Sequence, residues 1–178
     1  ESGNLKLEGQ STIATMMITD IRSFTVISES ESPKTILEWL NKYYGEIVPI
    51  INTNDGVTSE FIGDSIMAFF GILPVTLDPS ESARQACITA VEILKTVNAM
   101  NAKRQKEGIP PMVTGIGINT GEVAAGGIGT ADRLHYSVIG DAVNITQRLE
   151  NLTKVLGETS AIISEGTYEA LGIYRENF

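Results

Sequence analysis

The sequence has very few of the side chains that form disulfides or transition-metal sites. Its 178 residues include one cysteine, Cys87, and one histidine, His135. A single cysteine cannot form an intrachain disulfide, which is typical of a reducing compartment, and a single histidine excludes a multi-histidine zinc site and a Cys–His cluster. Because Cys87 lies among small apolar residues at helical spacing, we expect it to be a buried core residue.

Basic side chains and long apolar runs are also scarce. Thirteen Lys and Arg residues against 22 Asp and Glu residues give a formal net charge of −9. No cationic surface is left for a nucleic-acid backbone, so we expect no nucleic-acid partner. The apolar runs are shorter than the roughly 20 residues of a membrane-spanning helix, and no signal-peptide pattern is present. We therefore expect no membrane contact by this stretch and a cytoplasmic location.

Apolar residues make up 42% of the chain, enough for one globular domain over residues 1–178. Because the chain begins at Glu1, without a methionine, we expect it to be a piece of a longer protein whose anchor or regulatory domain lies elsewhere.

Hydrophobic periodicity and turn residues predict the order of the secondary-structure elements. We expect a strand over 11–21, followed by a helix that Ser32 caps, that begins at Pro33 and that Pro49 kinks or ends. A hairpin of VTSEFI and SIMAFF comes next, and then a helix that Asp78 caps and that runs from Pro79 to Gly108. Strands around MVTGIGI and EVAAGGI flank a turn at 119–121, and a strand through HYSVIG leads into a helix over 141–156. The strand SAIIS and a short helix from Ser164 complete the order. This β-α-β-β-α-β order predicts an α+β fold of the ferredoxin-like, palm type, an antiparallel sheet with helices on one face.

Two apolar segments carry further expectations about packing. The hairpin arm SIMAFF is apolar on both faces, so one face can pack on helices while the other also needs cover; a second chain is one source of that cover, and the arm is thus a hint of a dimer. In the helix from Asp141, an apolar stripe is expected to face the core; it consists of Ile145, Leu149, Leu152 and Leu156.

Two carboxylates are placed where they can meet. Asp20 ends the first strand, and Asp64 lies on the Gly63-Asp64 hairpin turn. Carboxylates at adjacent strand ends can hold two divalent cations for phosphoryl displacement, and hard oxygen ligands favour Mg²⁺ or Mn²⁺. For either residue alone, a strand end or a turn preference is an equally ordinary explanation.

In the helix from Asp141, Asn144 and Arg148 are four residues apart and therefore neighbours on one face. An arginine can stabilise charge on phosphate oxygens, and an asparagine can orient a ribose, although a solvated helix face also explains the pair. The glycine-rich stretch over 115–129 lacks the Lys-Ser/Thr of a Walker loop and is better explained as strands that approach another backbone closely.

Taken together, TDIRSFT, EFIGDSIMAFFG, GINTGEV and YSVIGDAVNITQRLE resemble the class III nucleotidyl cyclases in order and spacing, over roughly residues 10–170. The resemblance implies cyclisation of a nucleoside triphosphate with loss of pyrophosphate, at two composite sites of a homodimer. It implies that Asp20 and Asp64, with Ile21 as a further ligand, bind two divalent cations, Mg²⁺ or Mn²⁺. The backbone of Ile21, Arg22, Ser23, Phe24 and Thr25 would hold the β- and γ-phosphates.

The same resemblance implies that Asn144 orients the ribose, that Arg148 stabilises the transition state and that Arg133 binds phosphate. In the dimer, Asp64 would serve one site while Glu60, Asn144 and Arg148 of the same chain serve the other. Family members carry a further triphosphate-binding lysine in a C-terminal hairpin, and this chain is expected to end before it.

Two positions indicate the purine. Adenylyl cyclases of this class usually have Lys where this chain has Glu60, and Asp or Thr where it has Ser137. A carboxylate can accept from the two adjacent guanine donors, and a hydroxyl can donate to O6, whereas a carboxylate would repel the adenine N1 acceptor. We therefore expect a guanylate cyclase with GTP as substrate.

Other functions remain open. The alternatives are an adenylate cyclase with an unusual purine pocket and a non-catalytic, cyclase-like dimerisation module. A diguanylate cyclase is disfavoured because no GGDEF-like turn is present.

Overall fold

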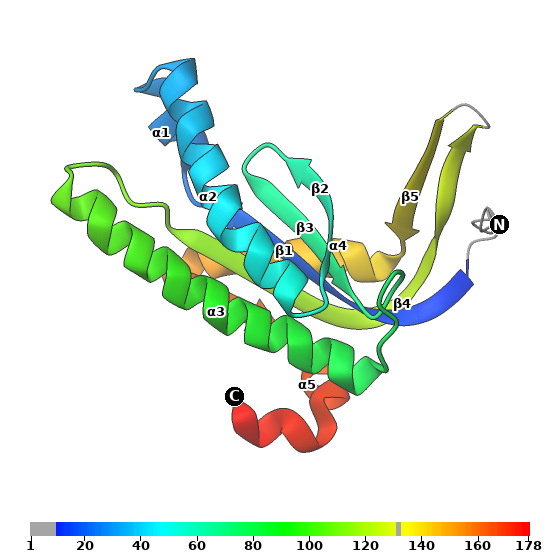
Figure 1. Ribbon diagram of the computed structural model, residues 1–178. Coiled ribbons are helices and arrows are strands. Elements are labelled where there is room, and N and C mark those ends of the chain that lie inside the picture. The colour runs from blue at the N-terminus through cyan, green and yellow to red at the C-terminus, as the bar shows by residue number, and fades with distance from the viewer. Residues whose placement is uncertain (1–9, 131–132) are drawn as a thin grey trace.

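The computed structural model describes residues 10–130 and 133–178, with the backbone alone described for 128–130 and 133–136. Figure 1 shows the order of the elements. They are β1 (Gln10–Ile21), α1 (Phe24–Glu29), α2 (Pro33–Thr53), β2 (Val57–Ile62), β3 (Ser65–Phe70), α3 (Pro79–Lys106), β4 (Thr114–Thr130), β5 (Arg133–Ile139), α4 (Asp141–Leu152), a 3₁₀ turn (Thr153–Leu156), β6 (Ser160–Ile163), α5 (Glu165–Leu171) and a final 3₁₀ turn (Gly172–Asn177).

One sheet organises the chain, in the order β2-β3-β1-β4-β5, with β6 paired to β4. Every pair is antiparallel except β4–β6. The β1–β4 ladder is the longest contact between elements and runs from Gln10–Ala125 to Ile21–Thr114. In Figure 1 the far half of β4 and β5 project as an arm beyond the body of the sheet. The α+β fold predicted from the sequence is confirmed.

The two long helices begin at the caps that the sequence predicts. The Ser32 hydroxyl accepts from the Thr35 N–H at the start of α2, and the Asp78 carboxylate accepts from the Ser80 and Glu81 N–H groups at the start of α3. Pro49 does not end α2, which continues to Thr53. Of the two predicted effects of Pro49, a kink or an end of the regular helix, the end is therefore wrong.

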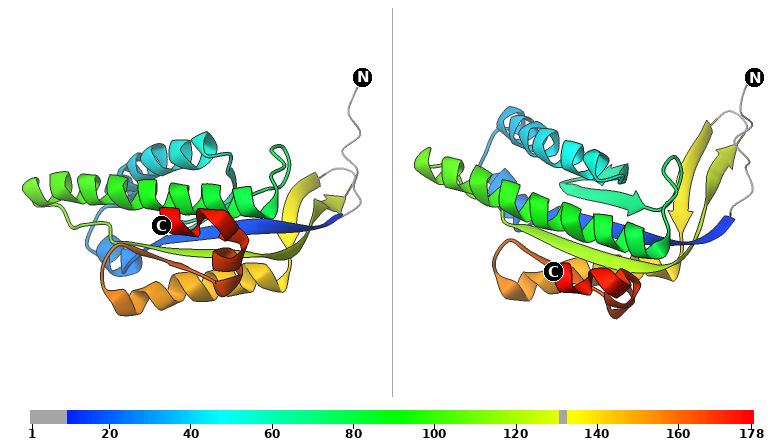
Figure 2. Two further views of the ribbon diagram at one scale, coloured as in Figure 1. Left: turned by 90° about the horizontal axis from the view of Figure 1, so that it is seen from below. Right: turned by 60° about the horizontal axis from the view of Figure 1, so that its bottom comes forward.

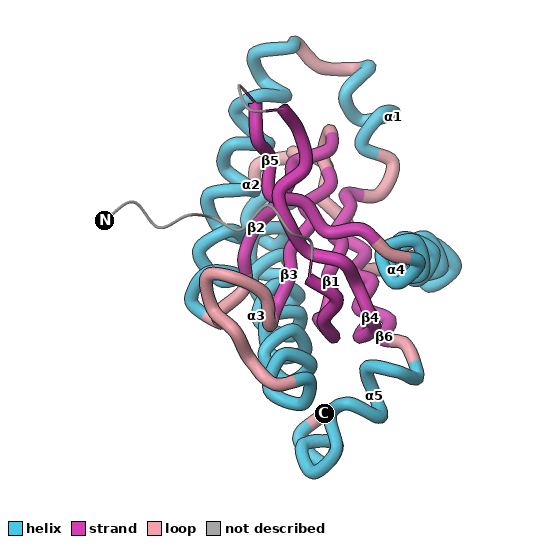
Figure 3. The backbone as a smooth tube through the Cα atoms, turned by 90° about the vertical axis from the view of Figure 1, so that its right-hand side faces the viewer, coloured by secondary structure: helices cyan, strands magenta, loops and turns pink. Residues whose placement is uncertain are grey.

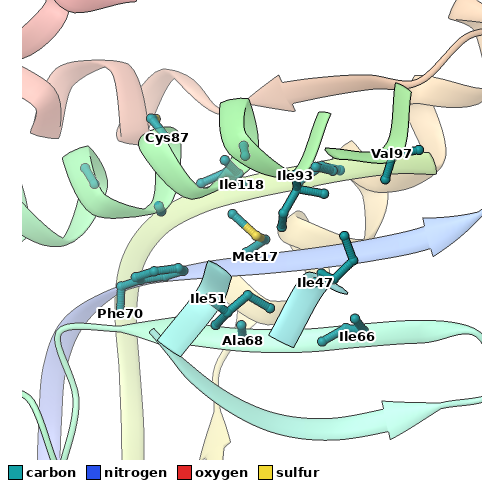
Figure 4. Close-up of a cluster of buried hydrophobic side chains, with 14 of the residues drawn as sticks. Met17, Ile47, Ile51, Ile66, Ala68, Phe70, Cys87, Ile93, Val97 and Ile118 are labelled. Atoms are coloured by element: carbon teal, nitrogen blue, oxygen red, sulfur yellow. The ribbon is translucent and has the colours of Figure 1, made fainter. Parts of the chain in front are cut away.

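Helices α2 and α3 cover one face of the sheet, and α4 lies against the other face of β4 and β1 (Figures 2 and 3). The cluster beneath α2 and α3 includes Met17, Ile47, Phe70 and Ile93, each fully buried (Figure 4). Cys87 belongs to the same cluster, and burial raises the pKa of its thiol to about 11. The expectation of a buried core cysteine is confirmed.

A second apolar cluster lies on the α4 face of the sheet. Phe69 of β3 is 1% exposed and packs there with Met16, Val123 and Ala142 of the same chain. The second face of β3 is therefore covered at Phe69 without a second chain. The argument from SIMAFF for a dimer is wrong on this point, because α4 and the β1–β4 pair supply the cover.

Strand β4 differs from the prediction of two strands joined by a turn. It is a single 17-residue strand, and no turn occurs at 119–121. Asn119 is buried, and its side-chain amide donates to the Ala142 carbonyl at 2.9 Å. The Thr120 hydroxyl forms hydrogen bonds with the hydroxyl groups of Thr15 and Thr167. These tertiary partners satisfy polar groups that resemble turn residues in the sequence.

Helix α4 turns a different face to the sheet from the one predicted. Its buried residues are Ala142, Thr146 and Glu150, whereas Leu152 is 54% exposed and Leu156 is 50% exposed. The reason is close contact with glycine in β4. A Cβ placed on Gly117 would lie 2.4 Å from both the Glu150 nitrogen and the Thr146 oxygen. Because α4 packs directly on the strand backbone there, small and polar residues face the sheet.

This contact predicts the effect of Gly117→Ala. The added methyl group must push α4 away from β4, so we expect a loss of about 1–3 kcal/mol in the free energy of unfolding, measured by chemical denaturation. Gly45→Ala is the matched control, because a Cβ there meets nothing within 4 Å and Gly45 lies inside α2. The control should be neutral or stabilising. Equal stability of the two variants would contradict direct packing of α4 on Gly117.

Candidate active site

The candidate site forms where β1 ends beside the β2–β3 turn. Strand β1 pairs with β3 as far as Thr19–Ile66, so Asp20 lies next to the turn that precedes Ser65. The Ser65 hydroxyl donates to Oδ1 of Asp20 at 2.5 Å. The backbone N–H of Ile21 donates to Oδ2 of Asp64 at 3.0 Å. Strand pairing thus brings together the two carboxylates that the sequence singles out.

The turn that carries Asp64 is fixed from one side by helix α2. Gly63 has a φ of +63°, a left-handed conformation that glycine adopts without strain. The Tyr44 hydroxyl of α2 donates to the Gly63 carbonyl, and the Tyr44 ring lies 4.7 Å from the Phe61 ring. Tyr44 therefore holds the hairpin turn against the body of the domain.

The two carboxylates repel each other in a partly buried setting. Burial, followed by the negative charge of Asp20, raises the pKa of Asp64 to about 6, although the Ile21 hydrogen bond opposes the shift. Burial and then the charge of Asp64 also raise the pKa of Tyr44. The site thus carries more negative charge than its protein surroundings compensate.

This donor set fits a hard divalent cation. Asp20 and Asp64 offer carboxylate oxygens, and a cation between them would relieve the repulsion that raises the pKa of Asp64. Within residues 10–130 and 133–178, no cluster of three or more acidic, histidine or cysteine side chains could hold a metal by itself. Two carboxylates are the number that Mg²⁺ commonly uses when substrate phosphates complete its coordination.

In the segment after Asp20, the first two backbone N–H groups already have hydrogen-bond partners within the domain. The N–H of Ile21 is bonded to Asp64, and the N–H of Arg22 donates to the Val113 carbonyl at 2.7 Å. Ser23 has a φ of 56° and precedes α1, so Phe24 and Thr25 open a helix whose first N–H groups have no partner inside it. The N–H groups with potential for phosphate are therefore those from Ser23 to Thr25.

The Arg22 side chain turns inward to α4. Its Nη1 lies 2.6 Å from Oε1 of Glu150, and its Nη2 donates to the Glu150 carbonyl at 2.9 Å. Sequence reasoning missed Glu150. Its position four residues after Thr146 and eight after Ala142 places all three on one face of α4, but only the structure shows that this face is the buried one.

The remaining predicted residues lie on other elements, which are α4, β2 and β5. Asn144 and Arg148 are exposed on α4, and in the described part of the chain no hydrogen bond or ion pair joins them to Asp20 or Asp64. Glu60 and Ser137 are half-buried on β2 and β5, which three strands separate in the sheet order. The Arg133 side chain lies outside the part of the chain that the structure describes.

The family model of the adenylate and guanylate cyclase catalytic domain matches residues 8–178. The chain belongs to this family. Adenylate cyclase 1 of Rhizobium meliloti is 35% identical over 84% of this chain, and the receptor-type guanylate cyclase gcy-23 of Caenorhabditis elegans is 36% identical over 80%. The chain spans only 22% and 13% of the lengths of these two relatives.

Solved cyclase structures confirm the fold of this cyclase domain. The guanylyl cyclase Cya2 aligns with a TM-score of 0.82 at 35% identity, over 93% of this chain and 81% of that one. The adenylyl cyclase CyaB from P. aeruginosa aligns with a TM-score of 0.85 at 31% identity, over 93% of this chain and 83% of that one. The cyclase domain is thus similar to proteins of both names. In the part of the chain that the structure describes, no helix is long and apolar enough to span a membrane.

The raised pKa of Asp64 makes a prediction about stability and pH. Because the folded domain holds this carboxyl at a pKa of about 6, above its ordinary value of 3.8, the folded state binds a proton more tightly than the unfolded state. The charged group is therefore destabilising above about pH 6. We expect Asp64→Asn to raise the Tm of the metal-free domain at pH 7.5, by roughly 2–4 °C for each kcal/mol gained.

The advantage of Asp64→Asn should shrink as the pH falls through 6 towards 4, because the wild-type carboxyl is then protonated as well. Thermal unfolding monitored by circular dichroism in chelator measures both values. A lower Tm for the variant at pH 7.5, or a difference that does not change with pH, would contradict the charge repulsion.

Proposed function

We propose that this domain is a guanylate cyclase, which converts GTP to 3′,5′-cyclic GMP and pyrophosphate. The observation that carries the proposal is the pairing of Asp20 with Asp64 at one end of the sheet of a cyclase fold. In the reaction the ribose 3′-oxygen forms a bond to the α-phosphorus, the bond from that phosphorus to the bridging oxygen breaks, and the 3′-hydroxyl proton is lost to solvent.

The residues take the following roles in this proposal. Asp20 and Asp64, with the backbone of Ile21, would hold two divalent cations, Mg²⁺ or Mn²⁺. When bound, these cations supply positive charge that favours ionisation of the 3′-hydroxyl and neutralises the phosphates. The segment 21–25 holds the β- and γ-phosphates, chiefly through the N–H groups from Ser23 to Thr25. Arg133 is a further candidate for phosphate binding.

Helix α4 supplies the other half of the chemistry. Asn144 orients the ribose, and Arg148 donates to the α-phosphate oxygens as negative charge builds on them. Both side chains are exposed on α4 and make no described bond to the carboxylates of their own chain. Their exposure supports a homodimer in which each site takes Asp20 and Asp64 from one protomer and Asn144 and Arg148 from its partner.

Exposed apolar side chains on and after α4 support the same arrangement. Leu152, Val155 and Leu156 are 54%, 82% and 50% exposed. Apolar side chains gathered at one end of a helix are typical of a surface that a partner covers. This surface, rather than the face of β3, is the one that we assign to the second protomer.

The shared sites predict complementation between two inactive variants. Asp20→Asn and Arg148→Ala should each lose at least about 100-fold in kcat, since each removes an electrostatic contribution to the transition state. When the two variants are mixed in equal amounts and allowed to exchange, half of the dimers are mixed, and each mixed dimer has one complete site. About a quarter of the wild-type activity should return.

Two copies of the same variant serve as the control and should remain inactive. A mixture that also stays inactive, in dimers shown by mass spectrometry to have exchanged, would contradict shared sites.

Guanine specificity rests on Glu60 and Ser137. The carboxylate of Glu60 accepts from N1–H and the N2 amine of guanine, and the Ser137 hydroxyl donates to O6. The test is product analysis with GTP and ATP supplied separately, with Mg²⁺ and with Mn²⁺. Cyclic GMP should dominate with either cation. Dominant cyclic AMP would instead support the adenylate cyclase activity for which the relatives in Rhizobium meliloti and Anabaena cylindrica are named.

A substitution of Glu60 sharpens this test. Glu60→Lys places a donor opposite the two guanine donors, so kcat/KM for GTP should fall by roughly 100-fold or more. ATP turnover need not rise, because Ser137 is unchanged. Glu122→Lys is the control, an exposed charge reversal on β4 whose kcat/KM should stay near that of the wild type. Unchanged GTP preference in Glu60→Lys would rule out Glu60 as the purine-reading residue.

A domain that converts neither nucleotide, while folded and dimeric, would be a non-catalytic dimerisation module. The presence of Asp20, Asp64, Asn144 and Arg148 together argues against that outcome.

A further inference from the structure

An ion pair connects the end of β1 to the buried face of α4. The Glu150 side chain is 1% exposed and that of Arg22 is 12% exposed. Arg22 reaches Glu150 twice, through the carboxylate at 2.6 Å and through the backbone carbonyl at 2.9 Å. Gln147 donates to the second carboxylate oxygen at 2.9 Å, and the Thr153 hydroxyl donates to the same carbonyl at 2.7 Å. The pair is therefore held in one geometry.

A glycine in β4 makes room for the Arg22 side chain. A Cβ on Gly115 would lie 1.6 Å from Nη2 of Arg22 and 2.2 Å from the Thr153 hydroxyl. Only glycine allows the guanidinium to cross β4 here and reach α4. An arginine that contacted only β1 would not need a glycine at position 115 of β4.

The same guanidinium also faces the candidate cation site. Nη1 of Arg22 lies 3.7 Å from Oδ2 of Asp20, beyond its 2.6 Å contact with Glu150. Glu150 therefore holds Arg22 back from Asp20. Without that anchor, the arginine would be drawn to the Asp20 carboxylate and would compete with a cation for it.

We propose that the Arg22–Glu150 ion pair is a positioning element, which keeps Asp20 available to divalent cations and fixes α4, with Asn144 and Arg148, relative to the carboxylate pair. The inference rests on the proposed function. In the shared-site dimer, Asp20 and Arg148 of one chain serve different sites, so the pair sets the spacing between the two sites within each protomer.

The test measures cation binding separately from turnover. The midpoint of Mn²⁺-induced stabilisation is determined by thermal unfolding of the nucleotide-free domain, and kcat is determined with GTP. Glu150→Gln keeps an acceptor but loses the charge that restrains Arg22, so the Mn²⁺ midpoint should rise by roughly 3- to 10-fold. Arg22→Gln removes the competing charge beside Asp20, so the midpoint should fall by a similar factor.

Both variants should lose about 10-fold or more in kcat, because α4 loses its anchor. Arg22→Lys retains the charge without the double contact, so the Mn²⁺ midpoint should stay near that of the wild type while kcat falls. If Arg22→Gln does not fold, Arg22→Lys still tests the positioning role through its loss of kcat. Arg104→Gln is the matched control, since Arg104 is 6% exposed and its described contacts are the Trp39 ring and the Pro110 carbonyl.

Opposite shifts of the Mn²⁺ midpoint in Glu150→Gln and Arg22→Gln, absent in Arg104→Gln, are the expected result. Midpoints that do not move, or a kcat loss no larger than in the control, would overturn the proposal. Failure of the wild type to convert GTP or ATP would instead reject the proposed function, and the Mn²⁺ midpoints would still decide the role of the ion pair.

Discussion

The meeting of Asp20 with Asp64 is the constraint on which the rest of the site depends. Strand pairing forces it, because the β1–β3 register ends at Thr19–Ile66 and leaves one carboxylate at the strand end beside another on the turn. Tyr44 fixes the turn, and the Ile21 N–H and the Ser65 hydroxyl orient the two side chains. Burial, followed by repulsion from Asp20, raises the pKa of Asp64, and this is the cost of the arrangement in the metal-free domain.

Helix α4 is the second element of the proposed site, and close backbone contact with β4 sets its position together with the apolar contact of Ala142. Gly115 and Gly117 let the Arg22 side chain and the α4 backbone approach β4 closely. The helix therefore turns Thr146 and Glu150 inward, keeps Ile145 and Leu149 half-buried, and leaves Asn144, Arg148 and Leu152 exposed. A chain built in this way has the carboxylate pair at the sheet end and Asn144 and Arg148 exposed on α4, which is the arrangement that the proposed shared-site dimer needs.

Local chemistry explains which parts of this structure can be predicted from the sequence. The hairpin at Gly63-Asp64, the caps at Ser32 and Asp78 and the strand that ends near Asp20 all follow from short-range signals, and all are confirmed. The continuous β4 and the buried face of α4 could not be found in this way. Asn119 resembles a turn residue until its amide meets Ala142, and the leucines of α4 resemble a core stripe until Gly117 admits the helix backbone. Glu150 was missed because a buried acid becomes plausible only when its partner, Arg22, is known.

The central claim is that Asp20 and Asp64 form one divalent-cation site. Calorimetric titration of Mn²⁺ into the nucleotide-free domain at pH 7.5 tests it most directly, with Asp20→Asn and Asp64→Asn beside the wild type and Asp141→Asn as a control at an exposed carboxylate of α4. Each substitution within the pair should weaken Mn²⁺ binding by about 10-fold or more, while the control binds like the wild type. Equal Mn²⁺ affinity in all four proteins would contradict the claim.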